Sequence, residues 1–503
     1  MKARQAYDEL IQRVREYSIL QSCAAVLDWD ERTYMPRAGS AHRSEQAALL
    51  ARMAHELFTS PRIGELLTVV EDSDLIHHEE SDEAVNVREI RRSYHRATKL
   101  PKDLVEELAR TTCRAQQVWQ EARRDNDFKS FLPWLENIVA LKRREAEAIG
   151  FDDCPYDALL DEYEPGATTA EINASFSALR KELVPLVGAI VESGKKPRRE
   201  ILEREYPLER QRIFGEAAAA AIGFDFRRGR LDVTTHPFCT GLGPGDCRLT
   251  TRYNLNHFSD AFFSILHEAG HGIYEQGLCP EHFGTPRGEA ISLGIHESQS
   301  RMWENFVGRS FPFWEYFFPR ACQTFHDALS DVSLDEFYFA VNDVQPSFIR
   351  VEADEATYNL HILLRFEIEQ ALVTGDLKPA DVPAVWNEKF KQAFNLTPPT
   401  DTLGCLQDVH WSSGGIGYFP TYTLGNMYAA QFMEVAQADL GGLEEDFRRG
   451  EFGRLKGWLN EKIHRPGKTY RAADLCFRVT GERLSHKPLL DYLRNKYSEL
   501  YGI

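Results

Sequence analysis

The stretch Ser264-Ile265-Leu266-His267-Glu268-Ala269-Gly270-His271 lies at the centre of the pattern that organises this 503-residue chain. We predict one helix over residues 264–276, which places His267 and His271 one turn apart on the same face. Two imidazoles at this spacing can bind one metal ion, and Glu268 beside the first of them can act as a general base on water. The simpler alternative is a solvent-facing helix that carries two histidines and a glutamate.

Apolar residues at 265, 266 and 273 favour a buried helix, in which a pair of histidines needs a partner such as a metal ion. Catalytic zinc sites usually have three protein ligands. Glu297 follows His271 by 26 residues, after a loop rich in glycine and proline, so a second helix can return it to the first. A solvated helix carboxylate is the alternative for Glu297. Glu281 and Glu289 in the loop, and Glu304 farther along, are competing acids.

Helical patterns extend in both directions from this segment. Residues 7–26, 47–58 and 104–122 have apolar side chains near helical spacing. Pro101 and Pro133 are interpreted as helix starts. Thr168 and Glu171 resemble a capping box that begins a long helix ending near Gly194. Beyond the motif, helices are expected over residues 346–369 and 424–440.

Residues 230–255 differ, because β-branched residues precede a turn-rich segment at 241–246 and a strand-like pattern resumes at 248–253. A small β-hairpin or sheet is therefore expected beside the metal helix. The predicted fold is mainly α, a large helical body formed by residues 1–503 as a single domain. Residues 1–195 form its N-terminal helical part, and residues 196–503 carry the metal site.

Composition limits the class of partner. There are 77 acidic and 59 basic residues, for a net charge of −18, which argues against a nucleic-acid or anionic-membrane partner. No run of about 18 apolar residues suggests a membrane span, and the first residues lack the apolar segment of a secretory signal. The nine cysteines are scattered without a CxxC pair, so a disulfide framework or a cysteine zinc site is not expected. A cytoplasmic protein is predicted.

Several motifs in a fixed order resemble the carboxypeptidase Taq family of metallocarboxypeptidases over nearly the whole chain. They are Leu27-Asp28-Trp29-Asp30, His236-Pro237-Phe238, Asp246-Cys247-Arg248-Leu249-Thr250, the HExxH motif itself, His296-Glu297-Ser298, Ile349-Arg350-Val351-Glu352-Ala353-Asp354 and Gly404-Cys405-Leu406-Gln407-Asp408-Val409-His410-Trp411. Each short motif is weak alone, but their joint order is specific.

This resemblance implies a helical fold with a deep active-site groove, a homodimer, and peptide substrates shortened by single residues from the C-terminus. It implies a broad preference for side chains, with a C-terminal proline resisted. Glu297 is the third ligand in the family's pattern. Zn²⁺ is the implied metal, one per chain, and Co²⁺ is expected to substitute for it.

A carboxypeptidase must bind a free terminal carboxylate, and the planar fork of arginine suits this best. Arg350 is the favoured candidate and Arg248 the second. The alternative for Arg350 is a structural ion pair, for example with Asp354 four residues later. His236 is a candidate for lining the groove beside the hairpin, with a purely structural histidine as the alternative.

Fixed donors must also stabilise the oxyanion that develops during peptide hydrolysis. His410 is the first candidate, followed by Tyr418 and then Tyr422 in a glycine-rich segment. A core aromatic role is the alternative for each tyrosine. Metal-bound histidines usually donate their second N–H to an acid or a carbonyl. The residue one turn after Glu297 is Arg301, so Asp354 and Asp408 are suggested as acidic partners from elsewhere.

Two other functions compete with a carboxypeptidase. An endo-acting metallo-oligopeptidase would use the same metal site without recognising the terminal carboxylate. A non-catalytic helical scaffold that binds peptides would hold no metal, although the intact pair of Glu268 and Glu297 argues against it.

Overall fold

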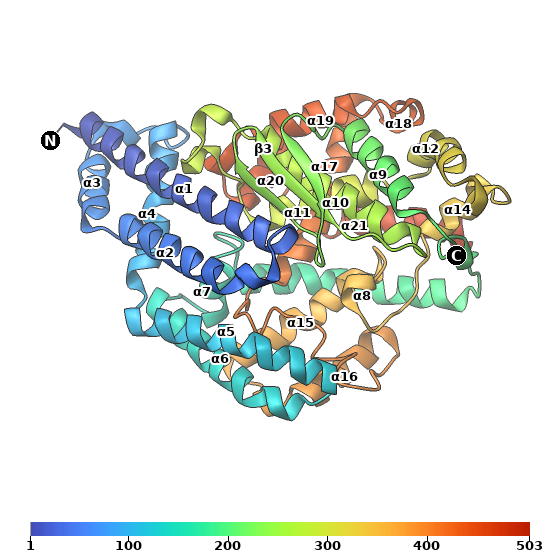
Figure 1. The fold of residues 1–503 in the computed structure, drawn as a ribbon, viewed down its shortest axis with the longest axis horizontal. Coiled ribbons are helices and arrows are strands. Elements are labelled where there is room, and N and C mark those ends of the chain that lie inside the picture. The colour runs from blue at the N-terminus through green and yellow to red at the C-terminus, as the bar shows by residue number, and fades with distance from the viewer. Residues whose placement is uncertain (1) are drawn as a thin grey trace.

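The computed structural model describes residues 2–503, and its architecture is mostly helical, as predicted (Figure 1). The N-terminal helices α1 (Ala3–Thr33), α2 (Ser40–Phe58), α3 (Pro61–Glu71) and α4 (Asp82–Lys99) lie at one end of the molecule. They have a small apolar core of their own, which includes Leu10, Leu66 and Ile90.

The next helices are α5 (Lys102–Asp125), α6 (Phe128–Ile149) and α8 (Thr169–Glu192). Pro101 is the N-cap of α5, and Thr168 caps α8 by accepting a hydrogen bond from the backbone N–H of Glu171, as predicted. The prediction for Pro133 was wrong, because Asp127, six residues earlier, caps α6, with its side chain accepting from Ser130 N–H. Pro133 lies inside that helix.

A hairpin is present, as predicted, and consists of β2 (Cys239–Gly243) and β3 (Asp246–Thr251), which pair antiparallel. The turn is shorter than expected, because residues 241–243 belong to β2. A third strand, β1 (Gly229–Val233), pairs parallel with β3, so that β3 is the central strand of the sheet. Gly229 is required at the start of β1, because a Cβ there would lie 2.3 Å from the carbonyl oxygen of Cys247.

The motif helix is α10 (Phe258–Gly277), and α11 (Leu293–Arg301) packs across it. On its other side α10 contacts β3 and α9 (Leu208–Ile222) (Figure 1). Phe258 and Phe262, in its first turns, stack in a buried aromatic cluster that includes Trp314. The N-terminal side of the motif is therefore fixed by packing, as the apolar residues around it suggested.

The helix expected over residues 346–369 is shorter in the structure. α15 (Thr357–Thr374) begins only after Asp354, whose carboxylate accepts hydrogen bonds from the backbone N–H groups of Ala356 and Thr357. The segment before it stays irregular, because Arg350 N–H bonds the side chain of Gln407. α17 (Pro420–Leu440) contains the other helix predicted.

The remaining helices complete the body around this centre. They are α7 (Pro155–Leu160), α12 (Phe311–Thr324), α13 (His326–Leu329), α14 (Leu334–Val341), α16 (Val382–Phe394), α18 (Glu444–Arg449), α19 (Gly453–Leu459), α20 (Ala472–Thr480) and α21 (Lys487–Tyr501). One apolar core runs from Ala115 on α5 to Tyr501 on α21. Within residues 2–503, every helix is too short or too polar to cross a membrane.

Candidate active site

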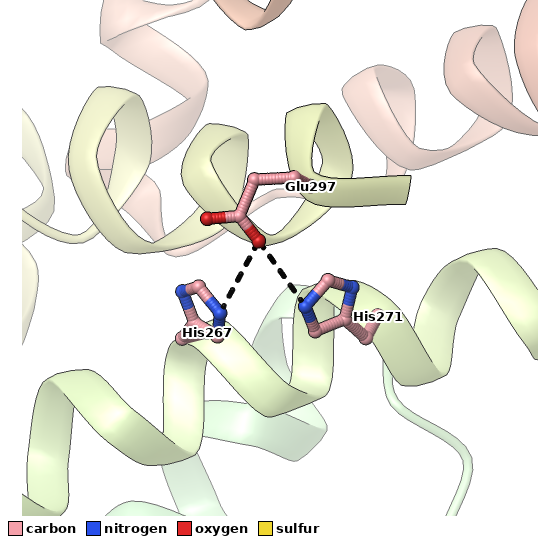
Figure 2. A group of neighbouring side chains, drawn as sticks. All are labelled: His267, His271 and Glu297. Atoms are coloured by element: carbon pink, nitrogen blue, oxygen red, sulfur yellow. Dashed lines mark ion pairs between the residues drawn. The ribbon is translucent and has the colours of Figure 1, made fainter. Parts of the chain in front are cut away.

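Three side chains from two helices converge on one point (Figure 2). The Nε2 atoms of His267 and His271, on α10, lie 3.6 and 3.5 Å from the same carboxylate oxygen, Oε2 of Glu297, on α11. Zinc ligands bonded at about 2.0–2.2 Å in a tetrahedron are roughly 3.3–3.6 Å from one another. The three groups therefore fit a divalent metal without rearrangement.

Small residues bring the helices close enough for this convergence. A Cβ at Gly270 would lie 2.5 Å from the carbonyl oxygen of Gln299, so α11 crosses α10 directly over the motif. A Cβ at Gly425 on α17 would lie 2.5 Å from the Cγ of Glu297, so α17 presses on the carboxylate from the other side. The position of Glu297 is thus set by backbone contacts on two sides.

The acid that supports His267 is Glu304. Its Oε2 lies 2.8 Å from Nδ1 of His267. Glu304 is seven residues, or two turns, after Glu297, in a π-helical turn that continues α11. Neither of the suggested partners was right, because Asp354 accepts hydrogen bonds from backbone N–H groups at the start of α15 and Asp408 binds arginines.

Arg301 stabilises the negative charges of both Glu297 and Glu304. Its guanidinium donates to Glu297 at 2.7 Å and to Glu304 at 3.0 Å. Burial raises the pKa of Glu297, but Arg301 and then His267 outweigh it and hold that pKa well below its usual range. The residue one turn after Glu297 is therefore a neutralising cation rather than a hydrogen-bond acceptor for histidine.

Glu268 lies beside this group and is 7% exposed. Burial raises the pKa of its carboxyl to about 7, although His267 acts in the opposite direction. A carboxyl with a pKa near neutrality can both accept and release a proton at the pH of the cell. This property matches the predicted role as general base.

His410, Tyr418 and Tyr422 form one aromatic cluster at the start of α17. The ring centroid of His410 lies 5.3 Å from that of Tyr418, and Nε2 of His410 lies 3.2 Å from the hydroxyl of Tyr422. Burial lowers the pKa of His410 to about 4, so its ring is neutral near pH 7. The nearby Gly417 serves packing, because a Cβ there would lie 2.9 Å from the backbone of Leu159.

Arg350 is 6% exposed and forms an ion pair with Asp408 at 2.8 Å rather than with Asp354. It also donates to the hydroxyl of Tyr358 at 2.9 Å. Arg365 donates to the other oxygen of Asp408 at 2.7 Å, so two guanidinium groups share one carboxylate.

The two remaining predicted residues lie at the sheet. Arg248 on β3 forms an ion pair with Asp246 at 2.8 Å, and its guanidinium carbon lies 4.1 Å from the ring centroid of Trp29 on α1. His236 is exposed in the loop between β1 and β2. The structure thus brings the three ligands and Glu268 together, whereas Arg248 is paired with Asp246 and His236 is exposed in its loop.

Known structures resemble this one over almost the full chain. The M32 carboxypeptidase from Deinococcus radiodurans superposes with a TM-score of 0.96 and 41% identity, covering 99% of this chain and 100% of that one. The carboxypeptidase of Pyrococcus furiosus superposes with a TM-score of 0.95 and 37% identity, covering 98% and 99%.

Sequence comparison agrees with the structural one. Thermostable carboxypeptidase 1 of Thermus thermophilus is 50% identical over 506 residues, which is 99% of each chain. Carboxypeptidase 1 of Bacillus subtilis is 40% identical, over 98% of this chain and 97% of its own. Residues 9–497 match the family described as carboxypeptidase Taq (M32) metallopeptidase. With His267, His271 and Glu297 arranged to hold a metal, the chain belongs to the carboxypeptidase Taq family of metallocarboxypeptidases.

Proposed function

We propose that this enzyme removes single residues from the C-termini of peptides, with broad preference for side chains and poor activity on a C-terminal proline. The observation that carries the proposal is the convergence of His267, His271 and Glu297 beside the buried Glu268. The peptide would lie in a groove over these groups. Family membership supports the choice of the C-terminal end.

His267, His271 and Glu297 would hold one Zn²⁺ per chain, with Co²⁺ able to replace it. Two imidazoles and one carboxylate leave a fourth position open, which is typical of catalytic zinc sites. When bound, the metal would polarise the peptide carbonyl and lower the pKa of water. Other divalent ions also suit this set of ligands, and metal analysis of the purified protein identifies the ion that is bound.

Glu268 would act as the general base. Its carboxylate accepts the proton of the attacking water and then delivers it to the nitrogen of the departing amino acid. Burial supports both steps, because it raises the pKa of Glu268 to about 7. A solvated glutamate would be a weaker base and would release the proton more readily to water.

The oxyanion would be stabilised by the aromatic cluster. Burial raises the pKa of Tyr418 to about 12, so its hydroxyl keeps the proton that it must donate. The hydroxyl of Tyr422 lies against His410 at 3.2 Å, which leaves Tyr418 the freer donor of the two. We therefore assign Tyr418 as the donor, with His410 and Tyr422 beside it and Tyr422 also contacting substrate.

The terminal carboxylate would bind at Arg350. Arg350 and Arg365 carry two positive charges and share the single negative charge of Asp408, and the neighbouring His410 is neutral. One positive charge therefore remains in a buried pocket of aromatic rings, where a carboxylate is strongly favoured. Arg248 and His236 would line the outer part of the groove beside the sheet.

Three further features belong to the proposal. Residues 1–503 would act as one catalytic domain, in which residues 1–195 support the part from 196 onward that carries the metal. The protein would be a homodimer, as the family resemblance implies, and would work in the cytoplasm. Its net charge of −18 fits a partner that is neither nucleic acid nor membrane.

Mass spectrometry of digested peptides tests this function. A peptide and its C-terminally amidated twin are incubated with the metal-loaded protein, with and without a chelator. A carboxypeptidase shortens only the free acid, and chelation stops it. Cleavage of both peptides would instead identify an oligopeptidase. Cleavage of neither would favour the non-catalytic scaffold that binds peptides.

Glu268→Gln separates chemistry from metal binding. The amide keeps the size of the side chain but cannot accept the proton, so metal content should stay at one ion per chain while turnover falls by roughly 10³-fold or more. Turnover within tenfold of the parent would contradict the role of general base.

A further inference from the structure

We propose that Glu275 acts through His296 as a positioning residue for the metal ligand His271. The inference rests on the proposed metal binding, but it concerns residues that bind neither the metal nor the peptide. His271 and Glu275 are four residues apart on α10, whereas His296 is on α11, directly before the ligand Glu297.

Three side chains form a continuous hydrogen-bonded relay. Nδ1 of His271 lies 2.6 Å from Nδ1 of His296, and Nε2 of His296 lies 2.8 Å from Oε1 of Glu275. The rings of the two histidines lie with their centroids 4.7 Å apart. The relay therefore starts on α10, crosses to α11 and returns to α10.

The position of every proton in this relay follows from the metal. Since Nε2 of His271 faces Glu297 and would bind the ion through its lone pair, Nδ1 carries the hydrogen of the neutral ring. That hydrogen points to Nδ1 of His296, which must then accept. The hydrogen of His296 is consequently on Nε2 and is donated to the carboxylate of Glu275. The negative charge of Glu275 thus fixes both the orientation and the tautomer of the His296 and His271 rings.

The fold leaves room for the Glu275 carboxylate beside β2. A Cβ at Gly241 on β2 would lie 2.4 Å from Oε2 of Glu275, so the strand backbone leaves room for this oxygen only because position 241 is glycine. Glu275 also borders a cavity of about 340 Å³ between the sheet and the end of α10, so solvent can reach its carboxylate.

The two metal histidines are therefore supported differently. His267 meets the carboxylate of Glu304 directly, at 2.8 Å. On its Nδ1 side, His271 reaches a carboxylate through His296. Carboxylates that bond metal-bound histidines raise the basicity of the ligand and fix its ring, and their loss typically costs 10–100-fold in metal affinity. The relay gives His271 this support and joins the two helices that carry the ligands.

Metal affinity of the full-length protein tests the relay. The dissociation constant for Zn²⁺ is measured by competition with a chromophoric chelator, and the visible absorption spectrum is recorded with Co²⁺ bound. Glu275→Gln keeps an acceptor oxygen for His296 but removes the charge, so we expect about tenfold weaker binding and a shifted Co²⁺ spectrum. Glu275→Ala should weaken binding by up to about 100-fold. Gly241→Ala displaces the carboxylate, so its Zn²⁺ affinity should lie between those of the parent and of Glu275→Ala.

A matched control is Glu289→Gln. Glu289 borders the same cavity and is paired with Lys468, but it does not bond His296, so its loss should leave both readings unchanged. In a His296→Phe background, Glu275→Ala should add nothing, because the two residues act in series. Thermal unfolding of the metal-free variants checks that each is folded.

The relay is refuted if Glu275→Ala binds Zn²⁺ within twofold of the parent, or if Glu289→Gln loses as much affinity as Glu275→Gln. Weaker binding by Glu275→Gln supports the relay even if the parent hydrolysed no peptide. Failure of the relay and failure of the proposed activity are thus seen in separate assays.

Discussion

Gly270→Ala tests whether the approach of two helices creates the metal site. A Cβ at this position would lie 2.5 Å from the carbonyl oxygen of Gln299 and 2.6 Å from Cα of Ser300. Both atoms are backbone, so no side chain can move aside. Since ordinary contact needs about 3.4 Å or more, α11 must retreat from α10 by roughly 1 Å.

This displacement exceeds what a metal site tolerates. Metal–ligand distances hold within about 0.2 Å, and Glu297 is carried by the helix that would move. The metal-free variant can relax by separating the helices, but binding must pull them together again. Overpacking of this kind costs about 1–3 kcal/mol, which corresponds to roughly 5- to 150-fold weaker metal binding.

The assay combines Zn²⁺ competition with thermal unfolding of the metal-free protein. Gly188→Ala is the matched control, because Gly188 lies within α8 and a Cβ there would meet no atom within 4 Å. That change should leave affinity unchanged and stabilise the protein by up to about 1 kcal/mol. If Gly270→Ala bound Zn²⁺ as tightly as the parent, the helix crossing would not set the site.

Three other changes give distinct results. Glu304→Gln removes the acid beside His267 and should weaken Zn²⁺ binding by about 10–100-fold, and equal affinity in a chelator competition would argue against it. Arg350→Lys loses the planar fork, so KM for free peptides should rise at least about tenfold with kcat nearly kept; an unchanged KM would remove Arg350 from substrate binding. Burial raises the pKa of Glu369 to about 7. Its protonated form therefore stabilises the fold fully below about pH 4.5, and this contribution, up to about 3 kcal/mol, is lost as the pH rises through 7. The unfolding midpoint of Glu369→Gln should therefore change less than that of the parent over this pH range. Midpoints of parent and variant that change with pH in parallel would contradict this.

The sequence predicted best what depends on local spacing. His267, Glu268 and His271 are on one helix, so their relation follows from its period. The cap at Thr168 is equally local. Glu297 could be predicted because only one loop separates its helix from the helix that carries His267 and His271. Each of these predictions needed little knowledge of how distant segments pack.

Contacts between distant segments were harder to predict. Asp408 meets Arg350 across 58 residues of chain, and no periodic pattern connects the two. Glu304 is closer to a local pattern, since residues seven apart share a helix face, but it lies two turns after Glu297 rather than one. β1 was missed as a partner of β3 because a parallel pair leaves no turn in the sequence between its strands.

Two buried glutamates at the site have different proposed roles, and their neighbours account for the difference. Glu268 and Glu297 are 7% and 6% exposed, so desolvation raises the pKa of both. Arg301, at 2.7 Å, reverses the effect for Glu297 and keeps it anionic, as a ligand must be. For Glu268 burial prevails, and its pKa of about 7 suits a group that exchanges protons. Environments that separate the pKa values of two carboxyl groups mark the division between permanent charge and proton transfer. Arg301 therefore distinguishes the proposed ligand from the proposed base, although it belongs to neither the proposed metal ligands nor the family motifs.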